Sequence, residues 1–253
     1  MTKHFLVLVA WLLCAGASLA ETPACTPAKF KIVLDVGHTA SSPGAMSARG
    51  ATEYSFNLKL ARRIEQELRD GGFVQTTVLI TEGDGRVQLF KRSKSANTIA
   101  PDLLLSIHHD SVPQSYLEPW THEGVQRSYS DRFSGFSVFI SRDMPKVKAS
   151  LAFAKLLATE LVNRELRFTL HYADTIRSES RVLLDRSLGV YAFDELVVLY
   201  KSKVPAVLFE AGLIVNRDEE LALASSERQG TIANAVHAAV VKFCERAASG
   251  ERR

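Results

Sequence analysis

The sequence predicts an α/β fold, in which a single three-layer domain is built on a twisted, mostly parallel sheet with helices on both faces. Apolar runs of strand length alternate along the chain with amphipathic stretches of helical period. Several of these runs, such as Leu103–Ile107, are unbroken rather than alternating, as in strands that are covered on both faces. The 253-residue chain has the length of one such domain after a short leader.

The first 20 residues predict a signal peptide. Lys3 and His4 form a basic start, residues 5–17 form an apolar core, and small residues stand at the expected cleavage site before Glu21. A membrane anchor is the alternative, but the apolar run is shorter than the roughly 20 residues that a span requires. We therefore expect a periplasmic or secreted protein with no membrane attachment once the signal is removed.

The charge of the mature chain argues against nucleic acid as a partner. Removal of residues 1–20 takes away one of the 31 Lys and Arg residues and none of the 28 Asp and Glu residues, which leaves a formal charge of +2. No run of basic residues accompanies this mild bias. An anionic polymer such as cell wall suits the sign of the charge.

Cysteine usage agrees with export. Cys14 leaves with the signal, so the mature chain holds Cys25 near its start and Cys244 near its end. An oxidising compartment permits a bridge between them, and two free thiols are the alternative.

The first half of the chain predicts three strands and two helices. Residues 52–70 form an amphipathic helix, because Phe56, Leu60, Ile64 and Leu68 recur every fourth residue and two glycines follow. The other expected elements are strands at 30–36, 73–81 and 103–107 and a helix at 87–98.

The second half continues the alternation. The expected elements are strands at 136–140, 196–200 and 206–209 and helices at 146–167 and 229–245. No internal repeat interrupts them, so we expect one domain over residues 28–246 and a short tail over 247–253.

Two long segments do not follow this rhythm. Residues 111–135 are polar and aromatic, and residues 169–191 are rich in charge. Long loops in a compact domain usually carry function, so we expect both to form walls of the site.

Four residues are candidates for chemistry. His38, His108 and Glu210 follow or end apolar runs, and Glu53 begins the first expected helix. An open sheet gathers its chemistry at the carboxyl ends of its strands. Two imidazoles and a carboxylate are the ligand set of an open zinc site, and a further carboxylate suits a general base. Each residue alone also has a purely structural explanation, although Glu210 after an apolar run needs a partner.

Four segments in this order resemble the zinc-dependent N-acetylmuramoyl-L-alanine amidases of the type-3 family. Asp35–His38 is similar to that family's Asp-Pro-Gly-His opening, and Glu53 stands where the second ligand lies. Ser106–Asp110 resembles the family's Ser-Ile-His-Ala-Asp/Asn segment. Pro205–Ile214, followed by Asn216, resembles its Pro-Ala-Val-Leu-Val-Glu-x-Gly-Phe-x-x-Asn segment. The resemblance spans nearly the whole mature chain.

The chain departs from the family pattern at four positions. They are Val36 for Pro, Thr39 for Gly, His109 for Ala and Leu213 for Phe. None of these departures removes a ligand or the base.

The resemblance implies a role for each candidate. His38, Glu53 and His108 would hold Zn²⁺ with water completing the shell, and Glu210 would take the proton of that water and pass it to the departing amine. Asp35 and Asp110 are candidates to orient the two imidazoles. The substrate implied is peptidoglycan, cut at the amide between N-acetylmuramic acid and L-alanine.

Other functions remain open from the sequence. A related zinc peptidase could cut within the stem peptide, and an inactive module of the same fold could bind or regulate at the wall. An activator protein is a further expected partner, because residues 169–191 stand where some relatives carry a helix that covers the zinc. We favour a charged, solvated loop that shapes the groove, because the segment is short and lacks a clear apolar stripe. The alternative is that Glu179 or Asp174 reaches the metal as a temporary ligand.

Overall fold

The structure is a computed structural model that describes residues 25–176 and 181–249, and it confirms the α/β class. The expected signal peptide lies outside the described residues. The strands are β1 (Ile32–Val36), β2 (Thr76–Leu79), β3 (Leu103–Asp110), β4 (Glu118–His122), β5 (Val125–Tyr129), β6 (Ser137–Ile140), β7 (Arg181–Asp185), β8 (Val190–Phe193) and β9 (Ala206–Leu213).

The helices lie mostly where the sequence predicts them. They are α1 (Glu53–Asp70), α2 (Gly85–Ile99), α3 (Val147–Val162), α4 (His171–Asp174), α5 (Val197–Tyr200), α6 (Arg217–Ala224) and α7 (Ser226–Ala248), with 3-10 turns at Pro27–Lys29 and Gln114–Tyr116. No helix of the described residues has the length and hydropathy that crossing a bilayer requires.

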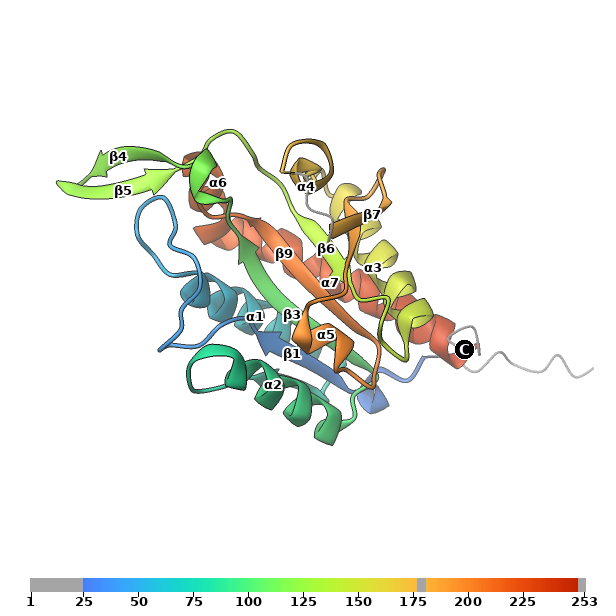
Figure 1. Cartoon of the computed structure of the whole chain (residues 1–253). Coiled ribbons are helices and arrows are strands. Elements are labelled where there is room, and N and C mark those ends of the chain that lie inside the picture. The colour runs from blue at the N-terminus through green and yellow to red at the C-terminus, as the bar shows by residue number, and fades with distance from the viewer. Residues whose placement is uncertain (1–24, 177–180, 250–253) are drawn as a thin grey trace, which may run out of the picture.

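A seven-stranded sheet in the order β2-β1-β3-β9-β6-β8-β7 forms the centre of the domain (Figure 1). β2, β1, β3 and β9 run parallel to one another, and β6 pairs with β9 antiparallel. The carboxyl ends of β1, β3 and β9 therefore meet at one edge of the sheet. The mostly parallel sheet that the sequence predicts is confirmed. The antiparallel pairs of the sheet are β6–β9 and β7–β8.

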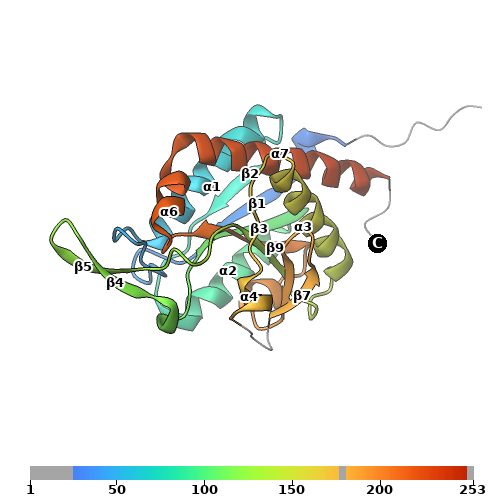
Figure 2. The same ribbon diagram turned by 90° about the horizontal axis from the view of Figure 1, so that it is seen from above.

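Helices cover both faces of the sheet (Figure 2). On one face α1, α3 and α7 bury residues such as Leu60, Phe153 and Val236 against alternate side chains of β1, β3 and β9. On the other face α2, α4 and α5 contribute Ala96, Tyr172 and Leu199 to a second core. The three-layer arrangement follows because the central strands β1, β3 and β9 are buried on both of their faces.

The start of α1 is set by its capping residue. The side chain of Thr52 accepts a hydrogen bond from the backbone N–H of Ser55 at 3.2 Å, which satisfies one of the free donors of the first turn. The residues that α1 buries recur at intervals of three and four, and the first of them is Glu53. The cap and the apolar stripe together place this carboxylate at the edge where β1 and β3 end.

Most expected elements differ from the structure by a few residues at their ends, as in β2 and β9, and two differ more. The helix expected at 146–167 ends at Val162, because Glu165 adopts a left-handed conformation with φ 61° and closes the helix with a Schellman pair of hydrogen bonds. The strand expected at 196–200 is wrong, since Val197–Tyr200 is the short helix α5. A short apolar run carries no period that distinguishes the two structures, and Val198 and Leu199 are buried in the second core either way.

The two long segments contain regular structure that the sequence did not predict. Residues 111–135 contain the hairpin β4–β5, which projects from the body of the domain (Figure 1). Residues 169–191 contain α4 and β7 and enter β8, which extends the sheet beyond β6. α7 also continues two residues past the domain boundary expected at 246.

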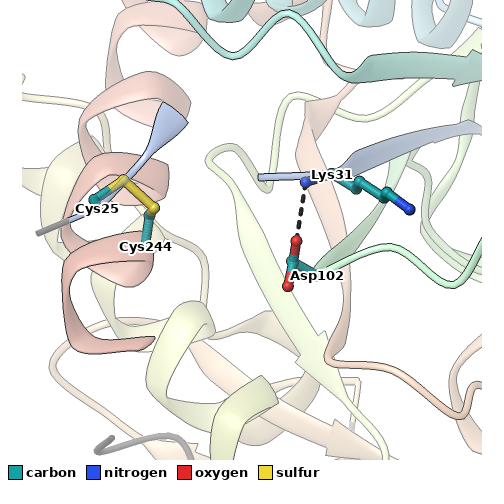
Figure 3. Close-up of a disulfide and its surroundings, with 4 residues drawn as sticks. All are labelled: Cys25, Lys31, Asp102 and Cys244. Carbon is teal, nitrogen blue, oxygen red and sulfur yellow. Dashed lines mark hydrogen bonds between the residues drawn. A yellow bond between two sulfur atoms is a disulfide. The ribbon is translucent and has the colours of Figure 1, made fainter. Parts of the chain in front are cut away.

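A disulfide joins the two ends of the domain. Cys25 and Cys244 are bonded, with 5.3 Å between their Cα atoms (Figure 3). The same close-up shows the backbone N–H of Lys31 donating to Asp102 at 3.0 Å at the start of β1. The bridge attaches the segment before β1 to the end of α7, where Cys244 is part of the main core.

Removal of this bridge is expected to cost much of the stability and little of the chemistry. The bond closes a loop of 219 residues, and the chain-entropy model assigns such a loop up to about 5 kcal/mol. Denaturant unfolding of the oxidised protein and of the Cys25→Ser/Cys244→Ser variant measures the difference. Equal midpoints, or two titratable thiols in the oxidised, denatured protein, would contradict this expectation.

Candidate metal centre

The four candidate residues converge at the edge where β1, β3 and β9 end. His38 follows β1, His108 lies near the end of β3, and Glu210 lies in β9 directly opposite His108 in the strand pairing. Glu53 reaches the same place from the first turn of α1. A pocket of about 300 Å³ is lined by all four residues.

Three of these side chains form a group with the geometry of a metal site. The Nε2 atom of His38 lies 3.0 Å from one carboxylate oxygen of Glu53, and the Nδ1 atom of His108 lies 3.0 Å from the other. One potential ligand atom from each residue lies within 4.8 Å of the other two. The structure thus brings together the donor set expected for an open zinc site, two imidazoles and a carboxylate.

Two glycines leave the space that these side chains occupy. A Cβ atom on Gly37 would come within 2.6 Å of the His108 ring, and one on Gly44 would come within 2.4 Å of the Glu53 carboxylate. Gly44 also has φ +77°, a conformation that favours glycine. The residues of the site therefore require glycine at both positions.

The backbone of the first candidate ligand is unusual. His38 has φ 65°, the left-handed conformation that few residues other than glycine adopt. The carbonyl of His38 accepts a hydrogen bond from the guanidinium of Arg92, and the carbonyl of Gly37 accepts one from the Asn57 amide at 3.1 Å. The surrounding structure thus holds this turn in a conformation that is costly in isolation.

The turn after His38 explains one departure from the family pattern. Thr39, which replaces Gly, is buried and donates its hydroxyl to the carbonyl of Gly83 at 2.9 Å. The same hydroxyl accepts the backbone N–H of Ser42 at 2.9 Å. Thr39 therefore secures the loop between β1 and α1 against the start of α2.

Asn57 contacts Glu53, and His109 contacts Asn57. The sequence by itself assigns neither of these two residues a role. The Nδ1 atom of His109 lies 2.7 Å from the Asn57 carbonyl oxygen, while the Asn57 amide also lies 3.3 Å from Glu53. Burial lowers the pKa of His109 to about 3, so its ring is neutral and Nδ1 is the donor. The sequence contained one signal for the role of Asn57. It lies four residues after Glu53, so both side chains are on the same face of α1.

The charge of Glu53 is set by the two imidazoles. Burial by itself would raise the pKa of this carboxyl, but the hydrogen bonds to His108 and His38 outweigh it and hold the pKa well below its usual range. Burial lowers the pKa of His108, so its ring favours the neutral form that a metal ligand needs.

Two further carboxyl groups, those of Glu210 and Asp110, line the pocket. Burial raises the pKa of Glu210 well above its usual value, and the nearby charges of Asp110 and Glu53 raise it further. The Oε2 atom of Glu210 is buried and has no hydrogen-bond partner among the described residues. In Asp110, by contrast, one oxygen accepts from Tyr172 and from the Ser111 N–H, and the other lies 2.9 Å from the same Tyr172 hydroxyl. Of the two carboxylates, Glu210 is therefore the one that has a buried oxygen without a hydrogen-bond partner in the described part of the chain.

The expectation that Asp35 and Asp110 orient the imidazoles is wrong. Asp35 is buried and accepts a hydrogen bond from the Ser106 hydroxyl at 2.6 Å, and Arg92 approaches it at 3.7 Å. Asp110 bonds to Tyr172, as described above. Within the described part of the chain, neither carboxylate makes a hydrogen bond to His38 or His108. Asp35 instead acts on the turn indirectly, through the Arg92 guanidinium.

Both long segments contribute to the pocket, as expected for its walls. Ser111, Val112 and Pro113 come from the first segment, and Tyr172 and Arg181 come from the second. Asp174 does not approach the site, because it forms an exposed ion pair with Arg186 at 2.9 Å. Glu179, the other residue considered as a temporary ligand, lies outside the described residues.

Another buried imidazole predicts how stability depends on pH. Burial, aided by the charge of Arg181, lowers the pKa of His171 from 6.5 to about 4. Between pH 6.5 and pH 4 the unfolded chain protonates this histidine and the folded protein does not. The neutral His171 ring therefore contributes fully to the free energy of unfolding above pH 6.5, and this contribution is lost as the pH falls toward 4. The loss is on the order of 3 kcal/mol.

His171→Gln is therefore expected to make stability less sensitive to acid between pH 7 and pH 4. Denaturant unfolding at both pH values measures the change, with His122→Gln on the hairpin β4–β5 as the matched control. The interpretation would be excluded by equal acid sensitivity of the His171 variant and the unchanged protein.

Comparisons with known proteins show which family and which fold the chain resembles. A family model described as N-acetylmuramoyl-L-alanine amidase matches residues 32–242. The chain is 26% identical over 227 residues to the N-acetylmuramoyl-L-alanine amidase AmiA of Escherichia coli, covering 85% of this chain and 76% of that protein. The chain also superposes on the N-acetylmuramoyl-L-alanine amidase of Clostridium difficile 630 with a TM-score of 0.63 and 19% identity, covering 85% and 96% of the two chains.

A second solved structure has the same fold. It is the CwlD amidase of Clostridioides difficile in complex with the GerS lipoprotein, with a TM-score of 0.59, 19% identity and coverage of 85% and 98% of the two chains. The fold and the order of the segments are thus shared along almost the whole described chain.

Proposed function

Since the chain belongs to the N-acetylmuramoyl-L-alanine amidase family, we propose that His38, Glu53 and His108 hold Zn²⁺ and that Glu210 is the general base of the hydrolysis. Members of this family are peptidoglycan hydrolases that act on an amide bond. The observation that carries the proposal is the convergence of two imidazoles and a carboxylate within 4.8 Å. Beside them lies Glu210, which has one buried carboxylate oxygen without a hydrogen-bond partner among the described residues.

The residues present fit a zinc ion. The donors are nitrogen and carboxylate oxygen, which zinc prefers, and three of them leave a position for water or substrate. Gly37 and Gly44 keep this space clear of side-chain atoms. When bound, zinc supplies Lewis acidity that activates water and polarises a carbonyl.

Glu210 is suited to moving a proton during the reaction. Burial raises the pKa of this carboxyl well above its usual value, which makes it a stronger base than an exposed glutamate. Its Oε2 atom has its lone pairs available, so it can accept a proton from water and release it to the departing alanine nitrogen. The proton taken from water thus ends on the nitrogen whose bond to the carbonyl carbon breaks, and the carboxylate is regenerated.

The neighbouring residues keep these groups in position. Asn57 and Arg92 hold the carbonyls of Gly37 and His38, which orients the His38 ring from its backbone. Asn57 also contacts Glu53, so one amide side chain connects two of the three proposed ligands. Their role is to preorganise the site, since neither contacts the reacting atoms.

We further propose that the enzyme acts outside the cytoplasm and that a partner protein regulates it. The bridge between Cys25 and Cys244 supports an oxidising compartment, as does the signal peptide expected at residues 1–20. A partner is suggested by CwlD, which has been solved with a lipoprotein. In this chain, Tyr172 and Arg181 of the charged segment 169–191 line the pocket. A partner that binds this segment would change access to the pocket.

Digestion of purified cell wall tests the proposed reaction. The mature protein loaded with zinc is expected to release intact stem peptides with a free alanine amine, detected by mass spectrometry, and a chelator should abolish the release. Shortened stem peptides would instead identify a peptidase, and zinc binding without any cleavage would identify a wall-binding module.

A further inference from the structure

The pocket contains an arginine that none of the roles above uses. Arg181 is the first residue of the edge strand β7, and its guanidinium lies over the rings of Tyr172 at 4.1 Å and Phe193 at 4.7 Å. The two rings fix the plane of the guanidinium without neutralising it. The side chain is thus held in place by packing.

Arg181 has no counter-ion in the part of the chain that the structure describes. Its side chain forms no hydrogen bond or ion pair there, and the Nε atom is buried and unpartnered. Arginines elsewhere on the surface, such as Arg142 and Arg217, do pair with carboxylates, those of Asp194 and Asp131. Arg181 therefore keeps its hydrogen-bond donors free.

The surroundings select an anion as the missing partner. Arg181 lines the same pocket as Glu53, Asp110 and Glu210, which are all carboxylates. Its charge is felt by Glu210 and Asp110 without contact to either. A planar guanidinium with free donors matches a carboxylate in two parallel hydrogen bonds.

The substrate of the proposed function carries such a group close to the scissile bond. The residue that follows L-alanine in peptidoglycan is a glutamate joined through its side chain, so its α-carboxylate remains free. Two residues of extended chain span roughly 7 Å, which keeps that carboxylate near the departing nitrogen and inside a pocket of this size.

We propose that Arg181 is a carboxylate-binding subsite that holds the α-carboxylate of the residue after L-alanine on the departing peptide. The inference rests on the proposed amidase function and extends it to the peptide side of the substrate. Arg181 positions the substrate, because it binds a group that does not react.

The test compares two synthetic muramoyl peptides that differ only in this group, a free carboxylate in one and a carboxamide in the other. The wild-type protein loaded with zinc is expected to favour the carboxylate by about 10–100-fold in kcat/KM, the range for hydrogen bonds to a charged group. Arg181→Met should reduce this preference to less than about threefold, mainly through KM. Arg181→Lys should retain part of it, since the charge remains but the planar pair of donors is lost.

Arg132→Met is the matched control, because Arg132 also lies over two aromatic rings, Tyr116 and Phe133, but does not line the pocket. This variant should keep the full preference for the carboxylate. An equal loss of kcat/KM on both substrates in Arg181→Met would overturn the proposal. That result would indicate that Arg181 stabilises the oxyanion or balances the charge of Glu210, since either role affects both substrates. An unchanged preference would overturn it as well.

A binding measurement keeps this inference separate from the proposed reaction. Calorimetry compares the dipeptide L-alanyl-γ-D-glutamate with its α-carboxamide, each with the zinc-loaded wild-type protein. Tighter binding of the carboxylate by about 10-fold or more supports the subsite even if neither muramoyl peptide is cut, an outcome that would count against the amidase function alone. Equal affinity would overturn the subsite whatever the outcome of the hydrolysis assay.

Discussion

Glu210→Gln is expected to lower the rate of wall hydrolysis by about 100-fold or more while zinc stays bound. Glutamine has the shape of glutamate but cannot accept a proton at neutral pH, so the substitution removes only the base. Glu210 is outside the group of three proposed ligands, which is why metal content should not change. Rate, zinc content and thermal unfolding of the purified variant measure the three parts of this expectation.

The same variant should be no less stable than the unchanged protein. The raised pKa of Glu210 means that ionising the carboxylate in the fold is unfavourable, and glutamine removes that cost at neutral pH. In the metal-depleted protein the stabilisation should be larger at pH 7 than at pH 4.5, because the folded protein keeps this proton at a pH where the unfolded chain has released it.

Asp110→Asn is the matched comparison for the assignment of the base. Asp110 lines the same pocket and has a pKa raised to about 6 by burial, but its oxygens already contact Tyr172 and Ser111. We expect a smaller loss of rate than in Glu210→Gln. If Glu210→Gln keeps more than about a tenth of the activity while Asp110→Asn loses nearly all of it, the base is Asp110.

His108→Ala is expected to remove both the metal and the activity. Two donors form a poor site for an ion that prefers four, so affinity should fall by more than the 10–100-fold that loss of an outer partner costs. His38→Ala should behave in the same way. Zinc content after dialysis, with the rate at saturating zinc, measures the effect.

The adjacent histidine provides the control for this experiment. The Nδ1 atom of His109 faces Asn57, and alanine is what the family pattern has at this position. His109→Ala should therefore keep zinc at one equivalent while losing some stability. A His108 variant that still binds one equivalent of zinc would show that the ligands lie elsewhere.

Local signals were sufficient for much of the fold and for the four central residues. Strands such as 103–107 were recognised because burial on both faces leaves an unbroken apolar run, and α1 because its apolar residues recur every fourth position. His38, His108 and Glu210 stood out because each is a polar residue at the end of an apolar run, at the sheet edge where an α/β fold gathers its polar groups. Glu53 had the weakest signal of the four, because the helix dipole alone also favours an acid at the start of a helix.

Short apolar segments and distant partners were beyond local signals. Val197–Tyr200 is a helix, not a strand, because four apolar residues fit either structure and packing against the sheet decides between them. α3 ends earlier than its composition suggests because Glu165 takes a left-handed conformation. In both cases backbone geometry that no periodic pattern encodes determined the outcome.

By itself the sequence determined the α/β class and the four candidate residues that meet at one edge of the sheet. Each of these follows from burial patterns and from residues near one another in the chain. Only the tertiary structure decided which groups support them: Asn57, Arg92 and Arg181 reach the site from α1, α2 and β7. The physical reason is that a hydrogen bond or an ionic contact depends on distances of a few ångströms between segments far apart in the chain, and the fold alone sets those distances.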